Sequence, residues 1–199
     1  MRHFYRKCSL ATTIGLATVA CNHSVAPEVT PTRVGTVQPA IQARVLLVLT
    51  PTFERYTTES QAGIHHYVVH LGESGSKALQ DMVGASFQHL EVQHVSEAAL
   101  PQWLALPGDT GRADLVLVPN FTGSFARVRF FDFATDVALQ LEVRCYRTGA
   151  TYSWVGTGHA TRAFGGWSGM TGSALELAVA ALADTLSSNR GKLEVVAAR

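Results

Sequence analysis

The chain has few cysteines, no marked excess of either charge, and no apolar run long enough to cross a membrane. Three cysteines occur among 199 residues, and 16 basic side chains stand against 15 acidic ones. The apolar run at residues 8–20 is about 13 residues long, which at about 1.5 Å per residue is too short for a hydrocarbon core of about 30 Å. The near-neutral charge argues against nucleic-acid binding, which needs a clustered basic face.

This short apolar run has the layout of an export signal. Arg2, Arg6 and Lys7 precede it, and small residues lead from it to Cys21. A basic start, an apolar centre and small residues before a cleavage point are typical of exported proteins. We therefore expect residues 1–20 to be removed, which leaves 13 basic and 15 acidic side chains in the mature chain.

The residues Thr18-Val19-Ala20-Cys21 resemble the lipobox of bacterial lipoproteins, although that family usually has Leu where this chain has Thr18. The resemblance implies that Cys21 is diacylated on sulfur and becomes the mature N-terminus, anchored in a membrane. By resemblance to enterobacterial sorting, Asn22 at the next position implies the outer membrane, with the domain on its periplasmic face. The alternative is an ordinary secretory signal that is cleaved near Ala20 without lipidation.

Cysteine use leaves no internal disulfide in such a mature chain. Cys8 leaves with the signal and the sulfur of Cys21 becomes a thioether, so Cys145 stands alone even in an oxidising periplasm. Because Cys145 continues an apolar alternation, we expect it to be a small core residue.

Residues 21–42 are expected to form an extended tether. Pro27, Pro31 and Pro39 lie in this stretch among few charges, and proline resists both helix and strand. About 20 residues, fully stretched, could reach about 65–70 Å. Residues 43–199 are then expected to be a single α/β domain with one core.

Apolar periodicities within residues 43–199 predict both strands and helices. Strands are expected at residues 44–49, 64–71, 90–95, 115–125, 136–145 and 151–160. One helix is expected to start at Ser74 or Ser76, and another near Ser173, after a glycine-rich loop at residues 165–172, with a stop at Gly191. The order predicts a two-layer α/β (α+β) sandwich, with a mixed or mostly antiparallel sheet and helices packed on one face.

Three short motifs carry a resemblance to a known class of protein. They are the strand at residues 113–118, the Thr148-Gly149 turn, and the strand containing Tyr152-Ser153-Trp154. As a set they resemble the periplasmic domains of small envelope lipoproteins, such as penicillin-binding-protein activators and the curli-export lipoprotein. The resemblance implies a domain without catalysis or cofactor that docks on another envelope protein.

Two segments have the composition of protein interfaces, which are enriched in arginine and aromatic residues. One is a predicted connection between strands at residues 125–133, and the other is the glycine-rich loop. The candidate partner-binding residues are Arg127, Arg129, Phe130, Phe131, Trp167 and Met170. The alternatives are that the phenylalanines alternate into the core, and that Trp167 pins its loop to the domain.

The competing hypothesis is a periplasmic hydrolase or a small-ligand-binding enzyme. Ser74 lies between a predicted strand and a predicted helix, and His65, His66 and His70 crowd one segment. On a strand, His66 and His70 share a face about 13 Å apart, too far to hold one metal ion at about 2.1 Å per bond. We therefore expect no metal site, although ligands from neighbouring strands could still meet. The simpler role for Ser74 is that of a helix cap.

Overall fold

The structure is a computed structural model that describes residues 21–30, 35–62, 65–105, 113–129, 132–162 and 166–198. Its elements, in chain order, are β1 (Cys21–Val25), β2 (Ile41–Leu49), α1 (Pro51–Glu54), β3 (Thr57–Ala62), β4 (His65–His70), α2 (Leu71–Ser86), β5 (Phe87–His94), α3 (Leu100–Ala105), β6 (Leu115–Arg129), β7 (Asp132–Cys145), β8 (Thr151–Arg162), α4 (Trp167–Ser188) and α5 (Arg190–Ala198). None of these described helices has both the length and the apolar content needed to cross a bilayer.

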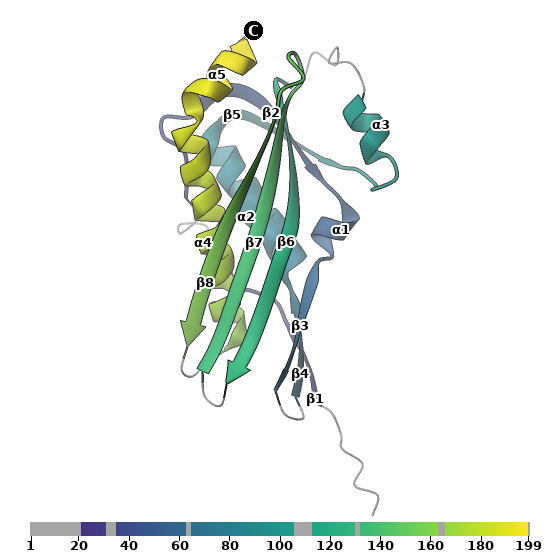
Figure 1. The fold of residues 1–199 in the computed structure, drawn as a ribbon, viewed down its shortest axis with the longest axis vertical. Helices are drawn as coiled ribbons and strands as arrows, with labels where there is room; N and C mark the ends of the chain where they lie inside the picture. The colour runs from purple at the N-terminus through teal and green to yellow at the C-terminus, as the bar shows by residue number, and fades with distance from the viewer. Residues whose placement is uncertain are drawn as a thin grey trace, which may run out of the picture.

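The larger sheet has five strands in the order β5-β2-β6-β7-β8. Strand β2 runs parallel to β5 and β6, whereas β6, β7 and β8 form an antiparallel meander. Helices α2, α4 and α5 pack against this sheet and place the main core between the two layers (Figure 1). The predicted mixed α/β architecture is therefore confirmed.

Strand β7 carries the period-two pattern that the sequence predicts. Its inward residues are at most 1% exposed: Val137, Leu139, Leu141, Val143 and Cys145. The residues between them lie on the opposite face and keep contact with solvent. The apolar stripes of the two long helices meet this inward face, and their core residues include Leu79, Met82, Leu175, Val179, Leu182 and Leu186. The core is thus built from the two periodicities visible in the sequence.

Helix α4 lies unusually close to β8 because two glycines remove the side chains between them. A Cβ atom added at Gly156 would lie 2.1 Å from the carbonyl oxygen of Ala178. One added at Gly158 would lie 1.8 Å from the carbonyl oxygen of Ala174. The helix backbone therefore rests on the strand backbone, which only glycine permits.

A second, three-stranded sheet in the order β1-β4-β3 extends the fold beyond the prediction. Strand β1 pairs in parallel with β4, and β3 pairs with β4 antiparallel. Only β4 was expected from the sequence. The missed strands have the sequences CNHSV and TTESQA, which lack an apolar alternation. Their pairing uses backbone groups that every non-proline residue carries, so the side-chain pattern does not reveal it.

Several predicted helix boundaries are wrong. Helix α2 begins at Leu71, so Ser74 and Ser76 lie inside it, and neither caps it. Helix α4 begins at Trp167, so most of the expected glycine-rich loop is helical. Helix α4 ends at Ser188, and the N–H of the capping residue Asn189 donates to α4 carbonyls. The predicted stop at Gly191 instead lies inside α5.

The expected tether instead packs on the domain along its described residues. Residues Cys21–Val25 form a strand, and the side chain of Ile41 is fully buried as the first residue of β2. Val37 is also buried, and its N–H donates to the Ser86 hydroxyl at 3.0 Å. Hydrogen bonds to acceptors on the folded domain offset the conformational entropy that the segment loses when it packs. Composition alone does not show such acceptors. Pro31 lies outside the described residues.

Candidate functional site

The residue expected to carry the lipid begins a strand of the small sheet. Cys21 is half-buried and pairs in register with His65, and pairing continues to Val25 opposite Val69. Figure 1 shows β1, β3 and β4 at the end of the molecule where β6 and β8 finish. We call this region the Cys21 end. Its described exposed residues include Asn22, His23, Gln61, Arg127 and Thr161.

The five residues after β1 are held by helices α2 and α4. The Ser74 hydroxyl donates to the Pro27 carbonyl at 2.8 Å, and the Ser168 hydroxyl donates to the Ala26 carbonyl at 2.6 Å. Farther along, the Thr30 N–H donates to a carboxylate oxygen of Glu176 at 2.6 Å, with the Glu176 side chain buried. The Glu28 N–H also donates to the Ser168 carbonyl. Four backbone groups of one short segment therefore have hydrogen-bond partners on helices that are distant in the sequence.

Glycine 172 explains how this segment lies so close to α4. A Cβ atom added there would lie 1.8 Å from the carbonyl oxygen of Glu28. Gly172 occupies the interior of the helix, where glycine is ordinarily unfavourable. Its role is therefore close backbone contact with the N-terminal segment rather than loop flexibility.

Trp167 and Met170 are core residues of the Cys21 end, which corrects the prediction that they bind a partner. They are only 7% and 4% exposed, and they cluster with Ala126. The Trp167 ring lies 4.9 Å from the ring centre of Tyr67 on β4 and 5.3 Å from that of Phe133 on β7. Trp167 thus joins the small sheet, the large sheet and α4, which is the alternative that the sequence left open.

Each histidine of β4 contacts a different side chain on one of the two neighbouring strands. His65 Nδ1 lies 2.9 Å from Nε2 of His23, and His70 Nε2 lies 2.9 Å from the hydroxyl of Ser24. His66 lies 3.2 Å from the Glu59 carboxylate. Within the described ranges, no three His, Cys, Asp or Glu side chains gather closely enough to hold a metal ion. The contacts observed instead hold β1 and β3 to β4.

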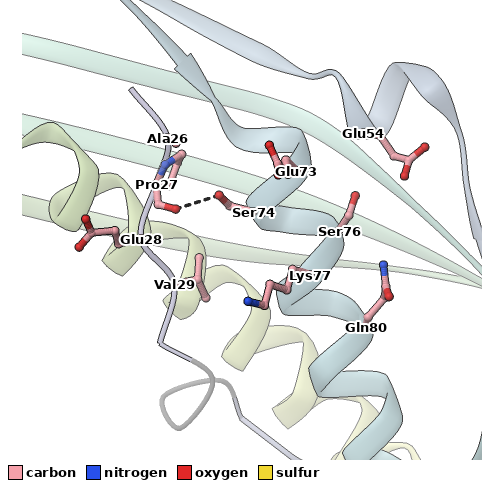
Figure 2. Close-up of a pocket in the computed structure, with 10 residues that line it drawn as sticks. All are labelled: Ala26, Pro27, Glu28, Val29, Glu54, Glu73, Ser74, Ser76, Lys77 and Gln80. Atoms are coloured by element: carbon pink, nitrogen blue, oxygen red, sulfur yellow. Dashed lines mark hydrogen bonds between the residues drawn. The ribbon is translucent and has the colours of Figure 1, made fainter. Parts of the chain in front are cut away.

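Ser74 lines a cavity of about 870 Å³ between the N-terminal segment and α2, shown in Figure 2. Glu54, Glu73 and Lys77 line the same cavity, and the described lining residues include no histidine. The Ser74 hydroxyl donates to the Pro27 carbonyl, drawn as a dashed line in Figure 2. A nucleophilic serine needs a base within about 2.6–3.2 Å, and the His65, His66 and His70 contacts described above do not supply one.

The described residues of the predicted connection at 125–133, which are residues 125–129 and 132–133, belong to strands. Strand β6 runs through Arg129, and β7 begins at Asp132. Arg127 is exposed, whereas the side chain of Arg129 lies outside the described part of the structure, as do Phe130 and Phe131 entirely. A fifteen-residue strand forms here because its register with β7 is continuous apart from one bulge near Gly123.

The outward face of β6, β7 and β8 carries two exposed apolar side chains, whose partners on β7 are four residues apart. Phe125 is 56% exposed and Val155 is 53% exposed. A shallow hollow of about 480 Å³ adjoins Phe125, with small residues such as Gly123 and Ala138 along it. Beside it, the His159 ring nitrogen lies 2.6 Å from the Asp136 carboxylate. We call these residues, together with Arg127, the β6–β8 face.

The α3 region covers the outward side of β2 and of the start of β6. Val116 and Leu46 of the large sheet pack with Leu100, Trp103 and Leu104 of the α3 region. This second small core accounts for the apolar residues there. The exposed apolar residues at Phe125 and Val155 lie beyond it and therefore have solvent on one side.

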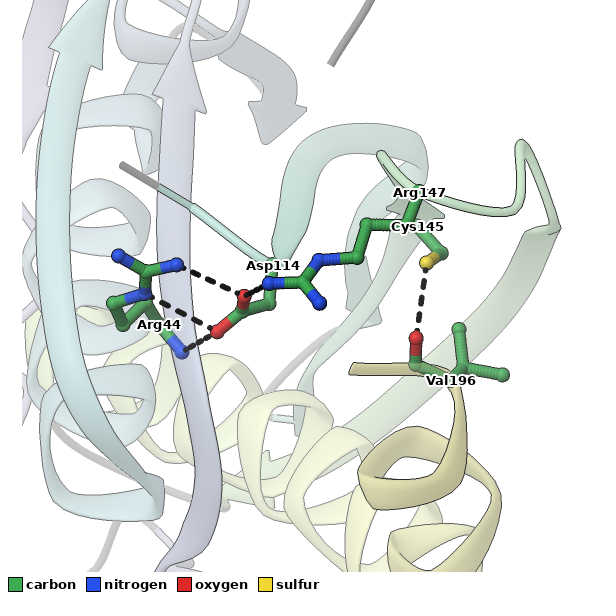
Figure 3. Close-up of polar contacts among 5 residues, drawn as sticks. All are labelled: Arg44, Asp114, Cys145, Arg147 and Val196. Carbon is green, nitrogen blue, oxygen red and sulfur yellow. Dashed lines mark hydrogen bonds and ion pairs between the residues drawn. The ribbon is translucent and has the colours of Figure 1, made fainter. Parts of the chain in front are cut away.

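Far from the Cys21 end, Asp114 joins the starts of β2 and β6 (Figure 3). The Arg44 backbone N–H and guanidinium both donate to its carboxylate, at 2.9 Å and 3.2 Å, and Arg147 lies 3.6 Å away. Burial raises the pKa of Asp114, but the hydrogen bonds and charge of Arg44 outweigh burial and leave the pKa below its ordinary value. The same figure shows the buried Cys145 thiol donating to the Val196 carbonyl at 3.4 Å.

The sequence matches no protein-family model and no curated protein. Among solved structures, a DUF330-family protein from Xanthomonas campestris is 12% identical with a TM-score of 0.49, over 86% of this chain and 98% of that one. A PelC dodecamer from Paraburkholderia phytofirmans is 17% identical with a TM-score of 0.43, over 77% and 91%. Lipoprotein GNA1162 from Neisseria meningitidis is 15% identical with a TM-score of 0.37, over 73% and 99%. None of these likenesses identifies a family for this chain.

Proposed function

We propose that this chain is a lipid-anchored periplasmic protein that assists an envelope assembly by protein contact, without catalysing a reaction. The anchor is the acylated sulfur of Cys21, and the membrane is the outer one. The contact surface is the β6–β8 face. The observation that carries the proposal is the exposed Phe125 ring beside a hollow on the outward face of the β6–β8 meander.

The anchor is supported by the signal that precedes Cys21 and by the place of this residue in the fold. Strand β1, which begins at Cys21, lies at one end of the molecule, where attached acyl chains can enter a bilayer without crossing the domain (Figure 1). Each buried methylene contributes about 0.8 kcal/mol, so two or three chains hold a protein far more firmly than one. The domain then needs no membrane-spanning helix of its own.

The contact surface is supported by composition and by exposure. Aromatic residues and arginine are enriched at protein interfaces, and Phe125 and Arg127 provide both on one strand. Neighbouring small residues leave a hollow beside Phe125 into which a partner side chain can fit. Asp136 and His159 supply polar groups at its rim. This surface differs from the one predicted from the sequence, because Trp167 and Met170 lie in the core.

No described contact favours the hydrolase alternative. Ser74 bonds to a carbonyl group, and the histidines of β4 bond to β1 and β3. The role of Ser74 that its contact supports is to hold the N-terminal segment.

Photo-crosslinking in intact cells tests the proposed surface. A photoreactive amino acid at Phe125 is expected to give a discrete adduct with an envelope protein. The matched control is Leu177, which is 51% exposed on α4 and has a similar apolar side chain. The replacement Arg127→Ala is expected to reduce the Phe125 adduct while the thermal unfolding midpoint stays unchanged. Adducts of equal yield at both positions would contradict the proposed surface.

A further inference from the structure

The strand that begins at Cys21 determines how the molecule stands on a membrane. Lipoprotein domains can hang from a flexible segment, but here the first residue after the predicted signal is already paired with β4. Pairing continues without interruption through Val25. No slack chain lies between the acylated residue and the folded body.

Contacts beyond β1 prevent the strand from swinging away as a unit. Residues 26–30 bond to Ser74, Ser168 and Glu176 on two helices. Inside the Cys21 end, Val25 packs with Trp167 and Tyr67. The anchor position is therefore part of the rigid body, unlike the tether of about 65–70 Å that the sequence predicts.

The exposed residues at this end suit a phospholipid headgroup surface. Apart from Arg127, which belongs to the β6–β8 face, the exposed side chains described at this end are polar: Asn22, His23, Gln61 and Thr161. Glu59 is an acidic residue in the same region, and it pairs with His66. Polar side chains of this kind can remain hydrated beside lipid headgroups. The anchor thus directs this end of the domain towards the membrane.

We infer that the domain stands upright, with the Cys21 end against the phospholipid headgroups and the β7–β8 turn pointing away. This inference rests on the proposed acylation of Cys21. Strand β8 has twelve residues, which at about 3.3–3.4 Å each places the far turn about 40 Å from the bilayer. The hollow beside Phe125 on the β6–β8 face then lies beside the membrane rather than on it, open to a partner in the periplasm.

Fluorescence quenching on the acylated full-length product tests this orientation. Thr161→Cys at the Cys21 end and Thr148→Cys at the far turn are both exposed labelling positions. Cys145 is fully buried and the sulfur of Cys21 is acylated, so a thiol-reactive fluorophore marks the new cysteine. In nanodiscs that contain lipid with a nitroxide headgroup, strong loss of emission is expected at position 161 and none at position 148.

A second variant distinguishes a domain held rigidly through β1 from a domain that merely stays near the membrane. A Gly-Ser linker of about 20 residues between Cys21 and Asn22 has a root-mean-square span of about 25 Å and frees the domain. The quenching at position 161 is then expected to fall to the level at position 148. Equal quenching at the two positions without the linker would overturn the inference, as would quenching that the linker leaves unchanged.

Metabolic labelling with a palmitate analogue distinguishes the two proposals. Labelled protein with equal quenching at positions 161 and 148 overturns the upright orientation alone. Protein that takes up no label overturns both the anchor and the orientation that rests on it.

Discussion

At the scale of single residues, Asp114 shows how one charge can hold several chain segments. Its carboxylate accepts bonds from the backbone and side chain of Arg44, and its own backbone bonds to β2 and to Tyr146. The side chain is only 12% exposed, so solvent screens these bonds weakly. Removing the charge leaves the partly buried Arg44 N–H and the Arg44 guanidinium, whose side chain is 42% exposed, without a charged acceptor.

Asp114→Asn is therefore expected to lower the free energy of unfolding at pH 7 by about 1.5–3 kcal/mol, the range for hydrogen bonds to charged groups. Because the pKa of Asp114 is lowered in the folded state, its contribution is present above the unfolded value of about 3.9 and is lost as the pH falls through the folded value. Urea unfolding at pH 7 and at a pH below the folded pKa measures this. The difference in unfolding free energy between variant and wild type should be smaller at the lower pH.

Asp184→Asn, the same change at an exposed position of α4, provides the control for Asp114→Asn. It is expected to leave the free energy of unfolding nearly unchanged at both pH values. If Asp114→Asn proved equally harmless at neutral pH, the described network would contribute nothing to stability.

Trp167 illustrates what side-chain identity does not reveal. A tryptophan beside glycines suits either an exposed anchor for a partner or an internal packing residue, and only its burial distinguishes them. Trp167→Ala is expected to cost about 3–5 kcal/mol of unfolding free energy, as for other large aromatic truncations in cores. Denaturant unfolding measures this loss, and Trp167→Phe should recover part of it. Unchanged stability with a lost crosslink at Phe125 would return Trp167 to the contact surface.

At the scale of elements, prediction succeeded where one side-chain period repeats. Strand β7 alternates between core and solvent, and the stripes of α2 and α4 face the sheet. Prediction failed for β1 and β3, because these short polar strands are stabilised by backbone pairing with β4. It failed for the start of α4 because glycines were interpreted as flexible.

The glycine in the first turns of α4 leads to a prediction for the N-terminal segment. Gly172→Ala would place a methyl group 1.8 Å from the Glu28 carbonyl oxygen if nothing moved. Residues 26–30 must therefore shift, at a cost of about 1–3 kcal/mol for an overpacked site. Hydrogen exchange is expected to show faster exchange at Thr30, whose N–H bonds to Glu176.

Gly191→Ala is the matched control on α5, since a Cβ atom there meets no described atom within 4 Å. Alanine favours helix over glycine by about 1 kcal/mol, so this variant is expected to gain stability and keep the exchange rate at Thr30. Equal exchange rates at Thr30 in the two variants would show that Gly172 does not hold the N-terminal segment.

At the scale of the whole molecule, the proposal depends on where the chain is held. Cys21→Ser removes the thiol that would be acylated and is expected to move the protein from the membrane to the soluble envelope fraction. Asn22→Asp keeps the acylation site and, by the enterobacterial rule, is expected to move the protein to the inner membrane. Membrane separation on a sucrose gradient measures both changes. A Cys21→Ser protein that stays with the outer membrane would contradict the lipid anchor.

The sequence by itself determined the mixed α/β class, the long helices and the alternating strand β7, because apolar periodicity follows directly from helix and strand geometry. It also determined the signal layout before Cys21, because that pattern is local. Only the tertiary structure decided that residues 21–30 pack on the domain, that Trp167 is internal, and that Phe125 remains exposed. These properties depend on contacts between residues far apart in the chain, such as Pro27 with Ser74, and no local pattern encodes such a pairing.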